Sequence, residues 1–191
     1  MGSSPAKTST RIQRLQAAVD KNPESAIARA RLGTALLQLE SVARGEQELR
    51  KAVELDPKCV EGWVNLGGAR LHQWDFEGCV EANRRAVECD PELVQAHYNQ
   101  GLGHMYLKQA EEMAACFQRV VALDPRHASG QYHLAVALLE LGRVQEAAMS
   151  MLRARELGFS PQPDFIKALQ RKLAAKSSPP EKEGAKSNPA Q

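Results

Sequence analysis

The chain has 191 residues, of which 43% are hydrophobic and 25% charged, a profile typical of a globular protein of about one domain. Its formal net charge of +2 argues against nucleic acid as a partner, because a nucleic-acid-binding surface needs a clustered basic excess. No apolar run approaches the roughly 18 residues of a membrane span, which argues against direct membrane insertion. The polar opening MGSSPAKTST, which lacks an apolar secretory segment, predicts a cytoplasmic location, and the four cysteines are expected to be reduced.

The first predicted element is a helix within the segment 11–25. Ile12, Leu15 and Val19 recur there at helical spacing and define one apolar side. The segment matches the second half of a two-helix unit, so we predict a half-repeat. Residues 1–10 are polar, and we expect them to be disordered.

Prolines then recur at intervals of 34 residues. They are Pro23, Pro57, Pro91 and Pro125. A proline cannot continue a helix and restricts the residue before it, so each one is predicted to end a helix and set the turn into the next unit. The period divides the chain into four predicted repeats, at residues 26–59, 60–93, 94–127 and 128–161.

Each predicted repeat contains two stretches of helical periodicity joined by a short break. In the second repeat Trp63, Leu66 and Gly67 lie on one side of a helix, where the small glycine allows a neighbouring helix to approach closely. This pattern and the 34-residue period resemble the tetratricopeptide repeat, W-x2-L-G-x2-Y followed by A-x3-F and P, over about residues 11–175. The resemblance implies an all-α fold, a right-handed superhelical solenoid of helix–turn–helix repeats.

The chain departs from the family pattern inside the repeats. Asn83 and Met151 stand where the pattern has an aromatic residue, and Arg70 and His104 occupy a slot usually given to tyrosine. These departures predict uneven packing rather than a different fold.

A capping helix is predicted at residues 164–175, after the last repeat. Ile166, Leu169 and Leu173 share one side of it, and charged residues occupy the other side, as expected for the end of a solenoid. Residues 176–191 have no apolar periodicity, and we expect a disordered tail.

The sequence carries no recognisable catalytic motif. It has no H-E-x-x-H, no G-x-S-x-G and no phosphate-binding G-x-x-x-x-G-K-[ST]. His97 and His104 are seven residues apart on one predicted helix, roughly 10 Å, which is too far for one metal ion. We therefore expect no enzymatic activity, no metal and no cofactor.

The family resemblance implies a concave groove lined by the first helix of each repeat. The side opposite the packed stripe then supplies the candidate peptide-binding residues, together with two tyrosines at its margin. They are Arg31, Glu61, Asn65, His72, Tyr98, Asn99, Tyr106, Tyr132 and His133.

Asn65 and Asn99 occupy the same slot in adjacent repeats. An amide both donates and accepts, so the two side chains suit an extended peptide backbone, which offers both groups. They resemble two rungs of the asparagine ladder in O-linked N-acetylglucosamine transferases, with Arg31 and His133 at the places of further rungs. The alternative is that asparagine is only a tolerated, solvated residue there.

Two functions are compatible with this sequence. The first is a non-enzymatic scaffold or adaptor that binds an extended peptide segment of a protein partner in the groove. The second is a structural protein that forms homo-oligomers through an uncapped end, because the lone N-terminal helix exposes an additional interface.

Overall fold

The structure, a computed structural model, describes the backbone of residues 5–177 and the side chains of residues 10–175. Within this range the chain forms ten helices and no strand. In chain order they are α1 (Pro5–Lys21), α2 (Ala26–Leu37), α3 (Val42–Leu55), α4 (Val60–His72), α5 (Phe76–Cys89), α6 (Val94–Tyr106), α7 (Ala110–Leu123), α8 (Ala128–Glu140), α9 (Val144–Glu156) and α10 (Pro163–Ser177).

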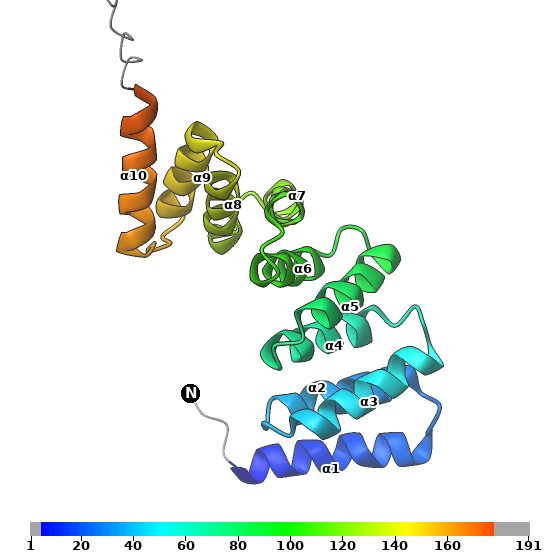
Figure 1. The fold of residues 1–191 in the computed structure, drawn as a ribbon. Coiled ribbons are helices and arrows are strands. Elements are labelled where there is room, and N and C mark those ends of the chain that lie inside the picture. The colour runs from blue at the N-terminus through cyan, green and yellow to red at the C-terminus, as the bar shows by residue number, and fades with distance from the viewer. Residues whose placement is uncertain (1–4, 178–191) are drawn as a thin grey trace, which may run out of the picture.

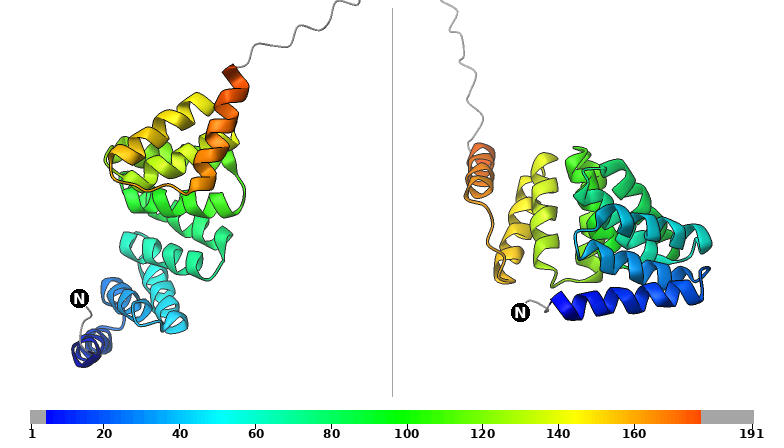
Figure 2. Two further views of the ribbon diagram at one scale, coloured as in Figure 1. Left: turned by 90° about the vertical axis from the view of Figure 1, so that its left-hand side faces the viewer. Right: turned by 90° about the horizontal axis from the view of Figure 1, so that it is seen from below.

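The helices from α2 to α9 form four consecutive pairs, one in each predicted repeat. The pairs stack into a curved array with α1 at one end and α10 at the other (Figures 1 and 2). The predicted all-α solenoid is therefore confirmed.

Both terminal helices are longer than the sequence suggested. Helix α1 begins at Pro5, so residues 5–10 are helical and not disordered as expected. The expectation overlooked that proline is well suited to the first position of a helix, where its missing N–H is not needed. Helix α10 extends to Ser177, two residues past its expected end. The remaining residues of the two predicted disordered segments, 1–4 and 178–191, lie outside the described residues.

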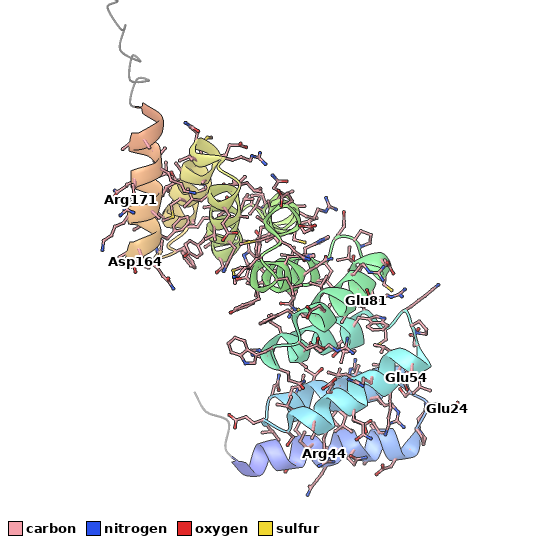
Figure 3. The ribbon with its side chains drawn as sticks, in the orientation of Figure 1. Glu24, Arg44, Glu54, Glu81, Asp164 and Arg171 are labelled. Carbon is pink, nitrogen blue, oxygen red and sulfur yellow. The ribbon has the colours of Figure 1, made fainter. Side chains whose placement is uncertain are left out.

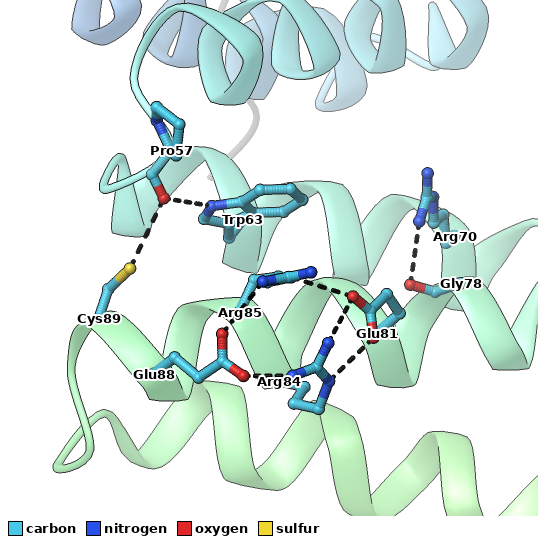
Figure 4. A network of polar contacts seen from close by, with 9 residues as sticks. All are labelled: Pro57, Trp63, Arg70, Gly78, Glu81, Arg84, Arg85, Glu88 and Cys89. Atoms are coloured by element: carbon cyan, nitrogen blue, oxygen red, sulfur yellow. Dashed lines mark hydrogen bonds and ion pairs between the residues drawn. The ribbon is translucent and has the colours of Figure 1, made fainter.

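The turns between repeats explain the regular proline spacing. In the second turn the Asp56 carboxylate accepts a hydrogen bond from the Lys58 backbone N–H at 2.9 Å, and the Pro57 carbonyl accepts one from the Trp63 indole at 2.8 Å (Figure 4). The proline carbonyl has equivalent partners in two other turns, Arg29 with Pro23 at 2.7 Å and His97 with Pro91 at 2.9 Å. In these three turns the proline follows the end of one helix, and its carbonyl anchors the first helix of the next pair.

A second recurring turn joins the two helices of each pair. One residue in it has a positive φ, and the four values are 58° at Glu40, 63° at Trp74, 58° at Lys108 and 72° at Gly142. The backbone N–H groups bond back to the preceding helix, as Asp75 does to Arg70 at 3.0 Å. This is the Schellman arrangement, in which a left-handed residue terminates a helix and glycine is preferred.

Inside each pair, a small residue on the first helix faces a larger one on the second. A Cβ built on Gly33 would lie 2.7 Å from Leu49 Cγ, and one on Gly67 would lie 2.1 Å from Asn83 Nδ2. Asn83 is fully buried, its amide donates to the Cys79 carbonyl at 2.8 Å, and its Oδ1 has no hydrogen-bond partner among the described residues. The second pair therefore buries a partly unsatisfied amide at a slot where the sequence departs from the family pattern.

We expect Asn83→Leu to stabilise the protein. A buried acceptor without a partner costs about 1–3 kcal/mol, and leucine already fills the equivalent place opposite Gly33. The midpoint of urea unfolding should therefore rise. The reverse change at the matched position, Leu49→Asn, should lower it, and a lower midpoint for Asn83→Leu would contradict this account of the slot.

Helix α10 covers the last pair. Its Leu169 is buried against a core cluster formed by α7, α8 and α9, and Phe165 and Ile166 pack on the same cluster. The exposed Asp164 and Arg171 lie along α10 (Figure 3).

Removal of residues 163–191 should lower both the melting temperature and the helical circular dichroism, because it exposes the apolar side of α8 and α9. The control is a second truncated protein that ends at Ser177 and keeps α10, and its melting temperature should equal that of the full chain. Equal melting temperatures for the two truncated proteins would show that α10 is not a structural cap.

Candidate functional site

A hollow of about 550 Å³ lies between the first helices of the first three pairs. Its polar lining comes from positions that share one side of α2, α4 and α6, and from the residue that follows α2. These residues are Thr34, Gln38, Asn65, Gly68, His72 and Gln95. Leu37, Val42, Val64 and Ala69 add apolar surface and Glu40 a carboxylate. We refer to this hollow as the inner groove.

Asn65 lines the inner groove and is half-buried. Its amide nitrogen donates to the Thr34 hydroxyl at 2.7 Å, and that hydroxyl donates to the Ala30 carbonyl at 2.8 Å. Asn99 lies next to the groove, because its Nδ2 would be 3.9 Å from a Cβ placed on Gly68. No described residue forms a hydrogen bond with the Asn99 side chain, so its amide can both donate to and accept from a ligand.

Three other predicted site residues are packed inside the fold. Tyr98 lies edge-on to Phe117 at 5.6 Å between ring centroids, and His133 stacks on Phe117 at 5.1 Å. Tyr132 stacks on Phe159 at 4.5 Å, next to α10. These rings therefore join neighbouring helices, although each remains partly exposed.

The surroundings of His133 disfavour its protonated form. Burial lowers the pKa of its imidazole, the nearby His127 lowers it further, and a hydrogen bond with the Ser129 carbonyl at 2.8 Å opposes both effects. The imidazole therefore binds a proton less readily than an exposed histidine does.

The lowered pKa of His133 predicts a pH-dependent loss of stability. Below the unfolded pKa of about 6.5 the unfolded chain binds a proton that the folded site resists, so the free energy of unfolding falls as the pH drops from about 6.5 toward the lower folded value. Urea unfolding at about pH 7.5 and about pH 5.5 should show a smaller difference for His133→Gln than for the wild type. The exposed His72 provides the control, and an equal reduction in His72→Gln would contradict the assignment.

A second hollow, of about 220 Å³, adjoins the first, and His72 lines both. Tyr106 is the other predicted site residue in it. Trp74 and Phe76 also line it, and neither is among the site residues predicted from the sequence. The signal was present in the 34-residue register, because Trp74 is an aromatic residue at a turn position that holds glutamate, lysine and glycine in the other repeats.

Arg31 and Glu61 are exposed and do not line either hollow. Among the described residues, no group of three or more histidine, cysteine or acidic side chains could hold a metal ion. Burial raises the pKa of the Cys79 thiol to about 11 and that of Cys116 to about 12, which disfavours the reactive thiolate form at neutral pH. None of the described helices combines the length and apolar character needed to cross a membrane.

Comparisons with known proteins agree with this architecture. A family model described as Tetratricopeptide repeat matches residues 12–58, 31–93 and 98–161, which together cover more than half of the chain. A comparison with curated protein sequences finds no match.

Solved structures show the same fold at low sequence identity. The structure of YrrB, described as a TPR protein with an unusual peptide-binding site, has a TM-score of 0.77 and 19% identity over 85% of this chain and 83% of its own. A MamA structure has a TM-score of 0.71 and 18% identity over 76% and 85%. The 41-end form of MamA from Desulfovibrio magneticus RS-1 has a TM-score of 0.69 and 20% identity over 76% and 82%.

Proposed function

Because the chain belongs to the tetratricopeptide repeat family, we propose that it is a non-enzymatic scaffold that binds an extended segment of a protein partner in the inner groove. The observation that carries the proposal is the placement of Asn65 and Asn99. Asn65 uses one of its two N–H donors on Thr34 and keeps its amide oxygen for a ligand, and Asn99 keeps its donors and its oxygen. An extended backbone offers the complementary N–H and C=O groups.

The comparisons support this proposal at the level of the fold. Repeat solenoids of this kind use extended concave surfaces for binding. YrrB, which shares the fold, is described as having a peptide-binding site. The cysteines at positions 59, 79, 89 and 116 are free thiols, which supports the proposed cytoplasmic location.

Homo-oligomerisation through α1 is the less favoured alternative. Helix α1 buries Val19 against Leu32 and Leu36 of α2, so its apolar side is already covered. Its exposed residues include Arg14 and Asp20, a polar surface suited to the end of a solenoid. Gel filtration with light scattering should give the mass of one chain, 21.0 kDa. A larger assembly that dissociates when α1 is changed would favour the alternative.

Affinity capture followed by mass spectrometry tests the proposal. The wild type should recover a protein that the Asn65→Ala/Asn99→Ala variant does not recover. Arg85→Ala is the control, because Arg85 is exposed on α5 and pairs with Glu81 and Glu88 of its own helix (Figure 4). Exposed pairs of this kind contribute little to stability, so this variant should retain the partner. Equal recovery by all three proteins would contradict binding in the inner groove.

A further inference from the structure

Three aromatic side chains form an exposed cluster beside the inner groove. Phe76 and Tyr106 stack at 4.5 Å with nearly parallel rings, and Trp74 crosses them at 6.0 and 6.1 Å with interplanar angles of 73° and 67°. Trp74 is 73% exposed and Tyr106 is 48% exposed. We call these three residues the aromatic cluster. It comes from the α4–α5 turn, the start of α5 and the end of α6.

Trp74 has an unfavourable backbone conformation for its residue type. Its φ of 63° lies in the left-handed region, where a bulky residue is an outlier and glycine is preferred. The indole contributes little to the core, since most of it faces solvent. The same positive φ recurs at Glu40, Lys108 and Gly142, so the turn accounts for the backbone, and what sets this position apart is the exposed indole that it carries.

The shape of the adjoining hollow suits one apolar residue. At about 220 Å³ it is smaller than the roughly 300–1,000 Å³ of pockets that hold a whole small molecule. Leu71 and Leu102 add aliphatic surface to the aromatic walls. The hollow also shares His72 with the inner groove, so a segment that lies in the groove can place one side chain here.

The charged residues in and near the two hollows indicate which charge a bound segment can carry. Glu40 is the one carboxylate among the described lining residues of the two hollows, and no lysine or arginine lines either of them. The exposed Glu77 follows Phe76, whereas Asp75 on its other side is paired with Arg70 at 3.7 Å. An acidic segment would meet carboxylates without cations among the lining residues, whereas a neutral or basic segment would not be repelled.

We propose that the aromatic cluster binds a proline of a neutral or basic partner segment, an inference that rests on the proposed function of the inner groove. Grooves lined by aromatic side chains are a recurring docking surface for proline-rich segments, and the aromatic cluster supplies such a lining. A polyproline II segment has no internal hydrogen bonds, so its carbonyls are free to accept from the Asn99 amide. It is also extended before binding, which reduces the entropy lost on association.

Selection from a random dodecapeptide library displayed on phage tests the inference without a known partner. Peptides retained by the wild type should be enriched in proline and depleted of aspartate and glutamate relative to the starting library. Selection with Trp74→Gly should lose the proline enrichment. This variant should fold at least as stably as the wild type, because glycine suits the positive φ, so its melting curve separates lost recognition from lost structure. Retained peptides without proline enrichment, or no retained peptides, would overturn the inference.

A synthetic peptide from the selection and its Pro→Ala version then separate the two levels of the hypothesis. The wild type should bind the proline peptide about tenfold more tightly than the alanine version, and Trp74→Gly should bind the two equally. The Asn65→Ala/Asn99→Ala variant should bind both peptides more weakly and keep the preference for proline. If Trp74→Gly still prefers the proline peptide, the aromatic cluster is not the proline site. If the Asn65→Ala/Asn99→Ala variant binds with unchanged affinity, the proposed role of the inner groove is wrong and the proline site is unaffected. Tryptophan fluorescence gives an independent readout, since Trp74 is one of two tryptophans and the other, Trp63, is bonded within the fold.

Discussion

Replacement of both Asn65 and Asn99 by alanine should weaken binding of the partner segment by roughly 5- to 150-fold, since each amide contact contributes about 0.5–1.5 kcal/mol net. The two side chains occupy the same slot on α4 and α6 and border the inner groove. A titration of the captured partner against the wild type and the double variant measures the effect.

The structure also supplies a control for the stability of this variant. Asn65 donates to Thr34, so its removal breaks one hydrogen bond within the fold. Thr34→Val breaks the same bond, together with the Thr34 bond to the Ala30 carbonyl, and leaves both asparagines in place, so its urea midpoint sets an upper limit on the structural part of the change. If the double variant binds normally, the partner docks elsewhere. If it unfolds much more easily than Thr34→Val, the asparagines are structural and the alternative given by the sequence is correct.

Gly67→Leu should reduce the free energy of unfolding by about 1–3 kcal/mol, the usual effect of overpacking. Even a Cβ at this position would lie 2.1 Å from Asn83 Nδ2, and Asn83 is fully buried between the helices of the second pair. The urea midpoint should therefore fall. Combination with Asn83→Ala should recover part of the loss, because that change removes the side chain with which the leucine collides.

The neighbouring glycine provides a matched control. A Cβ on Gly68 would meet only Asn99 Nδ2, at 3.9 Å, which is an ordinary contact. Gly68→Ala should therefore stabilise the helix by up to about 1 kcal/mol, as expected for glycine to alanine within a helix. Equal stability of Gly67→Leu and the wild type would mean that the assigned repeat register is wrong at this point.

The architecture could be predicted from the sequence because a proline ends a helix at the same place in successive repeats. Pro57 ends a helix, and its carbonyl receives the indole hydrogen bond of Trp63 at the start of the next unit. A 34-residue spacing of such turns leaves room for one helix pair, so the number and order of helices could be predicted without coordinates. The departure at Asn83 from the aromatic residue of the family pattern was also visible in the sequence, although its unsatisfied amide oxygen was not.

The composition of the site was harder to predict from the sequence. The exposed side of a helix can be deduced from a 100° rotation per residue, and this rule identified Asn65 and His72, which line the inner groove. The rule does not describe how neighbouring helices pack against each other. It therefore could not show that the rings of Tyr98 and His133 pack near Phe117 of α7.

The aromatic cluster escaped prediction for a related reason. Trp74 lies in a turn and Phe76 at the start of a second helix, and both fall outside the helical side from which groove residues were chosen. Their contact with Tyr106 of the next repeat depends on the conformation of the turn, including the positive φ at Trp74. Spacing along the chain does not contain this information.

The side-chain amide resonances of Asn65 and Asn99, followed by NMR during titration with the captured partner segment, test the groove hypothesis most directly. Binding in the inner groove should shift both resonances and leave unchanged those of Asn83, which is buried, and Asn22, which lies in the turn after α1. Shifts confined to residues of α3, α5 and α7, with Asn65 and Asn99 unmoved, would contradict the hypothesis.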